Sequence, residues 1–393
     1  MTGRRHDIAI AGGGLAGGLI ALALRRARPE LDVVLIEAGA APGGNHRWSW
    51  FASDLSPGAA ALLDSFRVAR WDSGYDVRFA GHARHLPTPY RSLASADFAA
   101  GLKRELAADG VRLNATIAAV GAGGVTLANG EQIAARTVID CRGLSAPSGL
   151  TGGWQVFMGR RLRTAVPHRL ARPVVMDAAV GQPGAFRFVY VLPLGASELF
   201  VEDTCYADSP ALDRRALSTR IEAYCQAQGW EGEPLDHETG VLPVITGGDF
   251  AAFQAAHRVP GVAVAGGRGL FVHPLTSYTL PFAAETALLI AAEAELPGDQ
   301  LAALLEDRAR RHWARTGFYR RLGAILFEAG APEQRHRVFE RFYRLPSPLI
   351  ERFYAARSTR LDRARVLCGK PPVPVMGAMR ALLSRGAPLE VAV

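Results

Sequence analysis

The sequence predicts an α/β protein that combines a Rossmann-type dinucleotide-binding domain, an interleaved β-rich domain and a C-terminal helical region. Three observations predict this fold class. A strand, a glycine-rich turn, a helix and a second strand follow one another at the start of the chain. Residues 154–204 are rich in strand patterns, and only helical patterns follow residue 300. A late buried strand, 261–266, indicates that early and late segments share one sheet.

The first unit is a β–α–β arrangement. Residues 7–11 (DIAIA) and 32–37 (DVVLIE) are apolar runs typical of buried parallel strands. Between them, residues 15–27 suit a helix that is apolar on nearly all its faces. This order predicts the opening of a parallel sheet with a right-handed crossover.

The turn of this unit has the form G-x-G-x-x-G, made by Gly12, Gly13, Gly14, Leu15, Ala16 and Gly17. Gly12 permits the tight turn, Gly14 lets the backbone approach a pyrophosphate, and Gly17 lets the helix pack on the strand. The helix N-terminus supplies free N–H groups for phosphate. Glu37 ends the second strand, where an acid binds ribose hydroxyls. The unit is predicted to bind a dinucleotide; the alternative is a glycine-rich turn in an ordinary α/β domain.

The remaining elements are expected in the following order. Helices are predicted over 96–109 and 210–228, and short strands around 111–116, 123–128 and 131–133, with Asn129-Gly130 as a hairpin turn. Further strands are predicted in TVIDCRG (137–143), VVMDAAV (174–180), FRFVYVLPL (186–194), ELFVEDT (198–204) and GVAVAG (261–266), and an apolar helix over 281–295. Breaks in the C-terminal helices are expected at Gly330, Pro346, Pro348 and 371–374.

This order makes the nucleotide-binding domain discontinuous. Residues 1–80, 96–150 and 256–300 are predicted to form it, residues 81–95 and 151–255 to form a substrate domain, and residues 301–393 to form the helical region. FAD is favoured over NAD because TVIDCRG and the segment 261–281 look like further parts of the same site. The second segment turns on Gly266-Gly267-Arg268-Gly269 and is expected to start a helix near Thr276, with its N-terminus toward the pyrophosphate or the flavin ring.

Composition limits the other classes. The formal net charge is +8, and Lys103 and Lys370 are the only lysines, so arginine carries the positive charge. A positive charge carried by arginine indicates either a GC-rich genome that favours arginine codons or attraction of the protein to a negative surface. The four cysteines lack CxxC spacing, which predicts a reduced, cytosolic chain, and the histidines lack metal-ligand spacing. No apolar run reaches about 18 residues, so no transmembrane helix is expected.

Two adjacent acids are the candidate catalytic residues. Glu202 and Asp203 end an apolar strand, and a carboxyl among apolar groups keeps its proton to higher pH, as a general acid must. Adjacent strand residues point to opposite faces, so the two acids cannot share one role. On the residues alone, acids that close a surface hairpin are an open alternative.

With these motifs in place, the chain resembles the bacterial lycopene β-cyclases of the carotenoid cyclase family of flavoproteins, nearly end to end. The resemblance is carried by DIAIAGGGLAGGLIALAL, GGNHRWSW (43–50), VIDCRG, MDAAV (176–180), FRFVYVLPL, LFVEDT (199–204), HPLTSYTLP (273–281), RFYRLPSPLIERFY (341–354) and GKPPVPV (369–375). The chain departs from the family at Cys141 and Ser277, where glycine is usual.

The resemblance implies conversion of lycopene through γ-carotene to β-carotene, by acid-initiated cyclisation of the polyene ends without net redox change. It implies Glu202 as the proton donor or the closest partner of the donor, and Asp203 as its support. It also implies reduced FAD as cofactor, with NADPH as the reductant. The further cofactor contacts it implies are Gly44, His46, Arg268, His273, Pro274 and Thr276. The rival functions are an FAD-dependent monooxygenase, a prenyl-chain reductase and a non-catalytic carotenoid-binding flavoprotein.

Two further groups of residues suit a polyene that lives in a bilayer. The candidates for the walls of a polyene tunnel are Trp48, Trp50, Phe186, Phe188 and Tyr190, with ordinary core packing as the alternative. Between Arg308 and Arg365, fifteen arginines outnumber five acids, and Phe318, Tyr319, Phe342, Tyr343, Phe353 and Tyr354 are interleaved with them. This pattern favours a peripheral hold on anionic lipid over a solvated helical cap. Nucleic acid is disfavoured, since no reader motif accompanies the charge.

Overall fold

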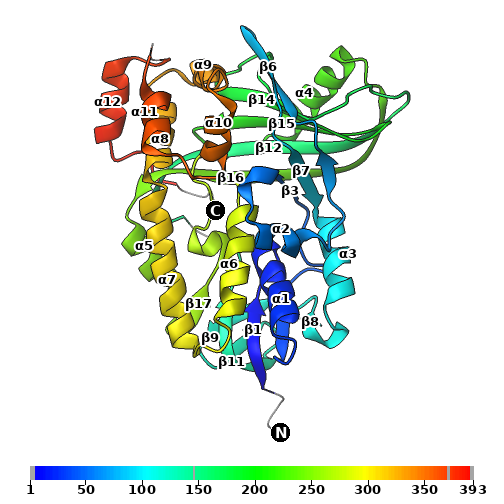
Figure 1. Ribbon diagram of the computed structural model, residues 1–393, viewed down its shortest axis with the longest axis vertical. Helices are drawn as coiled ribbons and strands as arrows, with labels where there is room; N and C mark the ends of the chain where they lie inside the picture. The colour runs from blue at the N-terminus through cyan, green and yellow to red at the C-terminus, as the bar shows by residue number, and fades with distance from the viewer. Residues whose placement is uncertain (1–4, 145–146, 370–371, 390–393) are drawn as a thin grey trace.

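The computed structural model describes residues 5–144, 147–369 and 372–389 of the chain. The molecule is elongated, with the N-terminal unit at one end and a large second sheet across the other (Figure 1). The predicted α/β class is confirmed. Two residues of the predicted motif 369–375, Lys370 and Pro371, lie outside the described residues. Pro371 is also the first residue of the predicted break 371–374.

A mostly parallel sheet forms the N-terminal end. Its strand order is β8-β2-β1-β11-β10-β9, and β17 also pairs with β11. The strands are β1 (His6–Ala11), β2 (Val33–Ile36), β8 (Val111–Arg112), β9 (Ile117–Gly121), β10 (Gly124–Leu127), β11 (Gln132–Asp140) and β17 (Val262–Val264). The late strand β17 pairs in parallel with β11, which in turn pairs in parallel with β1. Early and late segments therefore share this sheet.

Two strand predictions in this sheet are wrong in detail. The pieces predicted at 131–133 and 137–143 are one strand, β11, because its first half pairs with β10 and its second half with β1 and β17. The strand predicted over 111–116 covers only β8, and β9 was missed. The hairpin turn at Asn129-Gly130 is confirmed, and Gly130 has the positive φ of 87° that such a turn requires.

Helices cover one face of this sheet. Figure 1 shows α1 and α6 side by side, and their apolar side chains form one core with those of α3 and the start of α7. The helices of this end are α1 (Leu15–Ala27), α2 (Pro57–Leu63), α3 (Ser95–Glu105), α5 (Phe250–His257), α6 (Leu280–Ala292) and α7 (Gly298–Arg315), with short 3₁₀ turns η1 (Ala52–Asp54), η2 (Ala108–Gly110) and η3 (Gly266–Gly269). Helix α6 begins at Leu280, so the start predicted near Thr276 is wrong.

The second sheet has the strand order β16-β12-β15-β14-β13-β5-β6. Its strands are β5 (Tyr75–Phe79), β6 (His82–Leu86), β12 (Leu150–Thr164), β13 (Val174–Asp177), β14 (Phe186–Gly195), β15 (Glu198–Ala207) and β16 (Gly232–Gly248). The domain boundary predicted at residue 80 divides β5 from β6, which form one hairpin of this sheet. A third, small sheet of β3 (Arg47–Phe51), β7 (Tyr90–Ala94) and β4 (Ala69–Trp71) lies between the two larger ones.

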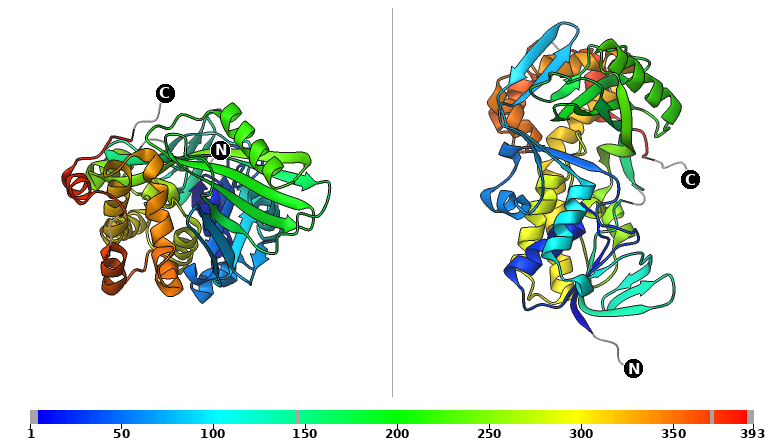
Figure 2. Two further views of the ribbon diagram at one scale, coloured as in Figure 1. Left: turned by 90° about the horizontal axis from the view of Figure 1, so that it is seen from above. Right: turned by 90° about the vertical axis from the view of Figure 1, so that its right-hand side faces the viewer.

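The second sheet is covered on both faces. Figure 2 shows α4 (Arg214–Ala227) on one side and the C-terminal helices on the other. These are α8 (Gly317–Glu328), the 3₁₀ turn η4 (Pro332–Gln334), α9 (His336–Phe342), α10 (Ser347–Tyr354), α11 (Arg360–Leu367) and α12 (Val375–Leu383). The aromatic residues of this region that were expected on an amphipathic surface are mostly core: Tyr319, Tyr343, Phe353 and Tyr354 are buried against the sheet.

Candidate functional site

A cavity of about 660 Å³ lies at the carboxyl ends of the parallel strands, at the N-terminus of α1. Gly12, Gly14, Leu15 and Ala16 line it. A Cβ atom on Gly14 would meet nothing within 4 Å, so a ligand can approach the backbone there. No side chain caps the N-terminus of α1 at Gly14, which leaves its N–H groups available to a phosphate. The cavity thus has the features of a dinucleotide site.

The other two glycines of the motif shape the turn. Gly12 has a φ of 102°, and a Cβ atom there would lie 2.9 Å from the carbonyl oxygen of Cys141. A Cβ atom on Gly17 would lie 2.0 Å from the carbonyl oxygen of Gly12, so only glycine lets α1 pack this close. Gly17 does not line the cavity; it supports the turn that does.

Glu37 lies at the wall of the same cavity. Its Oε2 accepts a hydrogen bond of 2.8 Å from the N–H of Gly13, and its Oε1 one of 2.7 Å from the N–H of Gly39. These bonds hold the carboxylate in place, where it can accept hydrogen bonds from ribose hydroxyls.

The segments predicted to contact the cofactor divide into two groups. Gly44 and His46 line the large cavity, and Thr276 lies at the wall of a second, adjoining one. The Oγ1 atom of Thr276 is buried and has no hydrogen-bond partner within the described part of the chain. Such an atom is available to a bound ligand.

Arg268, His273 and Pro274 line neither cavity. The Nε atom of Arg268 lies 2.9 Å from a carboxylate oxygen of Asp140. The Pro274 carbonyl accepts a hydrogen bond from Ile245. The three residues therefore shape the surroundings of the cavity.

His273 holds the loop that carries Thr276. Its Nδ1 accepts from the N–H groups of Leu275 and Thr276, and its Nε2 donates to the carbonyl oxygen of Phe353, 3.1 Å away. Burial lowers the pKa of His273 to about 3, so the ring is neutral, as this donor and acceptor pattern requires. These bonds explain why residues 273–279 form a loop where a helix start was predicted.

The two positions that depart from the family pattern fit the structure. Ser277 has a φ of 57°, the left-handed region that favours glycine, and its Oγ donates to the Pro243 carbonyl oxygen at 3.0 Å. Cys141 is buried at the wall of the large cavity, and burial raises the pKa of its thiol. Ser277 therefore keeps a glycine-like backbone and adds a tie to β16.

The second cavity, of about 290 Å³, joins the first. The residues common to the walls of both are His46, Trp48, Leu242, Ser277 and Thr279. Burial lowers the pKa of His46, which keeps the ring neutral at this junction. A group bound in the first cavity can therefore border whatever occupies the second.

Glu202 lies at the wall of the second cavity, on β15. Desolvation raises its pKa to about 7, opposed by a hydrogen bond of 2.6 Å that Thr204 donates to Oε1. A carboxyl with this pKa is about half protonated at neutral pH, and its acid form can donate a proton to a bound molecule.

Asp203 points to the other face of the sheet and does not reach the cavity. It is fully buried and lies 2.6 Å from Arg187 and 3.4 Å from Arg220. Any support that it gives Glu202 acts through the sheet, because the two side chains lie on opposite faces.

Sequence reasoning missed a third acid, Glu238, in the middle of β16. It is buried at the wall of the same cavity as Glu202. Burial, then the neighbouring Glu202 carboxylate, raises its pKa to about 8. Its segment (DHETGVLPV) has no clear strand alternation, so only its pairing with β12 reveals its position. Thr116 at the first cavity was also missed, whereas Arg142 and Gly143 belong to TVIDCRG, which was predicted as a further part of this site.

The predicted tunnel residues also divide. Trp48, Phe188 and Tyr190 line the second cavity, and the Tyr190 hydroxyl donates to Ser49 Oγ at 2.7 Å. Phe186 lies behind them, stacked on Phe339 at 4.3 Å between ring centroids. Trp50 is buried in the core against α1 and α6 and does not line either cavity. Aromatic faces at the cavity can stabilise a positive charge on a bound hydrocarbon.

Comparison with known proteins gives consistent results. A family model described as "Lycopene cyclase protein" matches residues 7–380. The chain is 45% identical to the lycopene beta-cyclase of Pseudescherichia vulneris over 380 residues, which cover 96% of this chain and 97% of that protein. It is 42% identical to the lycopene beta-cyclase of Paracoccus sp. (strain N81106 / MBIC 01143), covering 97% and 98% of the two chains.

Solved structures show the same fold at low identity. A flavin-dependent brominase superposes with a TM-score of 0.60 at 14% identity, covering 93% of this chain and 98% of that one. A geranylgeranyl bacteriochlorophyll reductase-like protein from Thermoplasma acidophilum superposes with a TM-score of 0.55 at 13% identity, covering 97% and 96%. The fold is therefore shared with these two proteins.

The two adjacent acids should differ in their effect on stability. Asp203→Asn is expected to lower the free energy of unfolding by about 3 kcal/mol, because it leaves Arg187 buried without its counter-ion. Glu202→Gln keeps an oxygen that can accept a hydrogen bond from Thr204. It should change the free energy of unfolding by less than about 0.5 kcal/mol. Denaturant titration of both variants measures the difference, and equal destabilisation would contradict the assignment of Asp203 to structure.

Proposed function

The chain belongs to the lycopene cyclase family, and from this premise we propose that it converts lycopene through γ-carotene to β-carotene by acid-initiated cyclisation. The observation that carries the proposal is Glu202, a carboxyl with a raised pKa at the wall of an aromatic cavity that adjoins the dinucleotide site. Its acid form can protonate the terminal double bond of the polyene. The neighbouring double bond then attacks the tertiary cation, and loss of a proton leaves the β-ring.

The residues of the first cavity fit FAD. The open approach at Gly14, the uncapped N-terminus of α1 and the oriented Glu37 carboxylate suit its ADP half, and the unpartnered Thr276 Oγ1 lies where the cavities meet. When bound in its reduced state, with NADPH as the electron donor that the resemblance implies, FAD would supply negative charge near the carbocation. Trp48, Phe188 and Tyr190 exclude water and orient the polyene end.

The central test is conversion of lycopene by the purified, FAD-loaded protein under reducing conditions. The product is expected to have the mass of the substrate and β-rings, and Glu202→Gln should lower the rate at least about 100-fold, the scale of general acid catalysis. Glu198→Gln, in the same strand and paired with Arg161, is the matched control and should keep full activity. A product heavier by oxygen or hydrogen would indicate a monooxygenase or a reductase, and lycopene left unchanged would contradict the proposal.

The rate should depend on pH through Glu202. The acid form is the donor, so the rate should fall as pH rises above about 7. The charged groups that act on Glu202 are Arg47, which lowers its pKa, and Asp203, which raises it. Arg47→Gln should therefore move the alkaline limb to higher pH. A limb that does not move in this variant, or a rate that does not fall at alkaline pH, would argue against Glu202 as the donor.

We also propose that α12 attaches the protein to a lipid surface. No helix of the described residues is both long and apolar enough to cross a membrane. One face of α12 is exposed and apolar, made by Val375, Met376, Met379, Leu382 and Leu383. The opposite face packs on α8: a Cβ atom on Gly377 would lie 2.7 Å from the Ala329 carbonyl oxygen, and Ala381 is buried. The helix contains Arg380 and no acid, which suits anionic headgroups.

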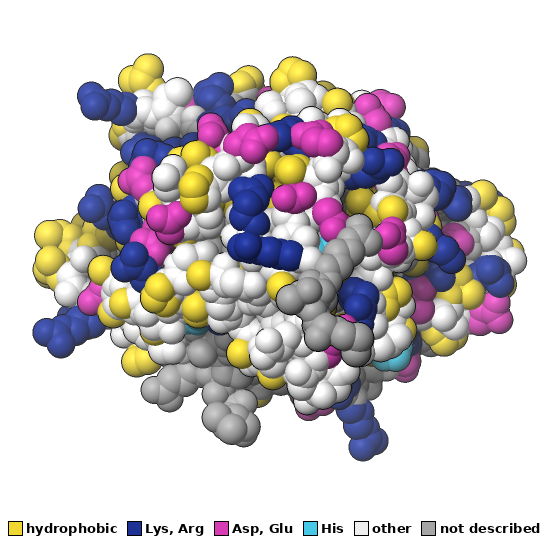
Figure 3. All heavy atoms as spheres, turned by 90° about the horizontal axis from the view of Figure 1, so that it is seen from below, with side chains coloured by type: hydrophobic (Ala, Val, Ile, Leu, Met, Phe, Trp, Pro, Cys, Tyr) yellow, Lys and Arg dark blue, Asp and Glu magenta, His cyan; other side chains and the backbone are white. Residues whose placement is uncertain are grey.

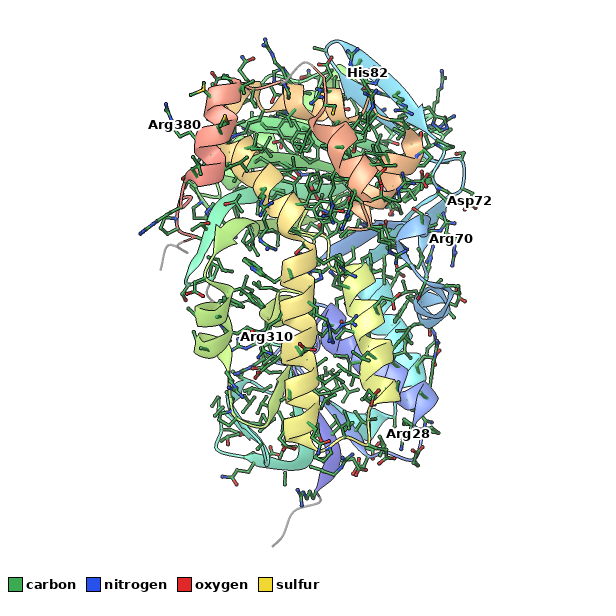
Figure 4. All side chains as sticks on the ribbon, turned by 60° about the vertical axis from the view of Figure 1, so that its left-hand side comes forward. Arg28, Arg70, Asp72, His82, Arg310 and Arg380 are labelled. Carbon is green, nitrogen blue, oxygen red and sulfur yellow. The ribbon has the colours of Figure 1, made fainter. Side chains whose placement is uncertain are left out.

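The position of α12 agrees with such a contact. Figure 4 shows Arg380 at the outer edge of the molecule, at the end opposite Arg28. The other end has a different surface: seen from below, acidic, basic and apolar side chains are interspersed (Figure 3). The exposed apolar face of α12 is therefore a local feature of the C-terminal helical region.

Vesicle sedimentation tests this attachment. The double variant Met376→Glu, Leu383→Glu should bind anionic vesicles of phosphatidylglycerol at least tenfold more weakly, because each change removes an apolar side chain from the lipid contact. Leu113→Glu, an exposed leucine after β8 in the other domain, is the matched control and should bind normally. Unchanged binding by the double variant would exclude α12 as the attachment site.

A further inference from the structure

Four residues form one row across the second sheet. In the pairing of the strands, Tyr190 on β14 lies opposite Glu202 on β15, Glu202 opposite Gly159 on β12, and Gly159 opposite Glu238 on β16. Directly opposed residues share a face, so Glu202 and Glu238 point to the same side. Both line the second cavity. Their Cα atoms are two strand spacings apart, roughly 10 Å.

The floor between the two glutamates is apolar. A Cβ atom on Gly159 would lie 2.2 Å from the ring of Phe200, so glycine is what admits this ring between them. The guanidinium of Arg47 lies 5.2 Å from the centroid of the same ring. The Phe200 ring therefore lies over Gly159, between the two strands that carry the carboxyls.

Glu238 is held by the segment 43–50, one of the segments that carry the resemblance to the cyclase family. Asn45 Nδ2 donates to the carbonyl oxygen of His237 at 2.9 Å. The backbone N–H of Arg47 donates to the Glu238 carboxyl, and the Arg47 charge also favours its ionised form. This segment thus brings the wall of the dinucleotide cavity against Glu238 and orients its carboxyl.

We propose, on the premise of the cyclase function above, that Glu238 is the general base of ring closure, which accepts the proton that the ring loses after Glu202 has donated its own. Glu202 and Glu238 are then a donor and acceptor pair on either side of one polyene end. Two desolvated carboxyls that repel each other when both are ionised can hold one proton between them. Ring closure starts from the form in which Glu202 holds this proton, and the N–H of Arg47 stabilises the ionised carboxylate of Glu238 in that form.

The proton balance closes within the pair. The O–H bond of Glu202 breaks as a C–H bond forms on the terminal double bond, and the neighbouring double bond forms the new C–C bond to the cationic carbon. The C–H bond at the ring carbon that carries the polyene chain then breaks, its proton passes to Glu238, and its electrons form the ring double bond. The hydrocarbon is isomerised without net redox change, and the pair is reset when Glu238 loses its proton and Glu202 regains one from solvent.

This assignment gives Glu238 control over the position of the ring double bond. The same cation can lose a proton from the adjacent ring methylene or from the methyl group, which gives isomeric rings. A base fixed beside the chain-bearing carbon selects the β-ring. A residue that only supported the fold would not affect this choice.

The test uses the full-length, FAD-loaded protein, with lycopene in phosphatidylcholine vesicles, in D₂O. Glu238→Gln is expected to lower β-ring formation at least about 100-fold. Gln keeps an oxygen that can accept from the Arg47 N–H, so the fold should be retained. Lycopene recovered from this variant should carry deuterium at its terminal double bonds, because Glu202 still protonates it reversibly, whereas lycopene from Glu202→Gln should carry none. Glu233→Gln, exposed on the same strand, is the matched control.

The outcomes separate as follows. Slow turnover with deuterated lycopene, or rings with a displaced double bond, supports Glu238 as the base. The assignment would be overturned if Glu238→Gln formed β-rings at the normal rate. Slow turnover with undeuterated lycopene would also overturn it, because the step that the substitution slows would then precede deprotonation of the ring. A wild-type protein that forms no rings would instead refute the cyclase function on which the assignment rests.

Discussion

The alternation of side chains along β15 is the constraint on which the site depends. It sends Glu202 into an aromatic cavity, where desolvation raises its pKa, and Asp203 to the opposite face, where it forms ion pairs with Arg187 and Arg220. Two neighbouring acids thus lie in opposite environments. A shift of register by one residue would exchange the two environments and leave the cavity with the wrong acid.

The second constraint is the junction of the two cavities. Segments from three distant parts of the chain meet there: His46 with Trp48 at the start of β3, Leu242 on β16, and the loop with Ser277 and Thr279. Buried groups that line neither cavity hold these segments, such as His273 beneath the loop. The dinucleotide site and the acid site are therefore parts of one continuous space, although the sheets that carry them are separate.

The C-terminal helices serve the core as much as the surface. Their aromatic residues close the second sheet on the side of the cavity. There Tyr354 contacts the ring of Tyr278, which is linked through Tyr90 to Tyr190 by hydrogen bonds between hydroxyls. Arginine in this region is also partly neutralised, as in the pairs of Arg352 with Asp362 and Arg344 with Glu340. The proposed lipid contact is supported by the exposed apolar face of α12, which the count of arginines and aromatics did not indicate.

The sequence by itself determined the dinucleotide unit, because a glycine motif, a helix and an acid at fixed spacing depend only on local backbone geometry. It also singled out Glu202 as a candidate general acid, and the resemblance to the cyclase family, not the strand pattern, favoured this role over that of an acid in a surface turn. Only the tertiary structure decided which groups surround that acid. Glu238 and Gly159 become its neighbours through pairing between strands that lie far apart in the chain, and register between such strands is set by packing of the whole sheet. For the same reason, only the tertiary structure shows that His273 and Arg268 shape the surroundings of the site, whereas Thr276 lies at its wall.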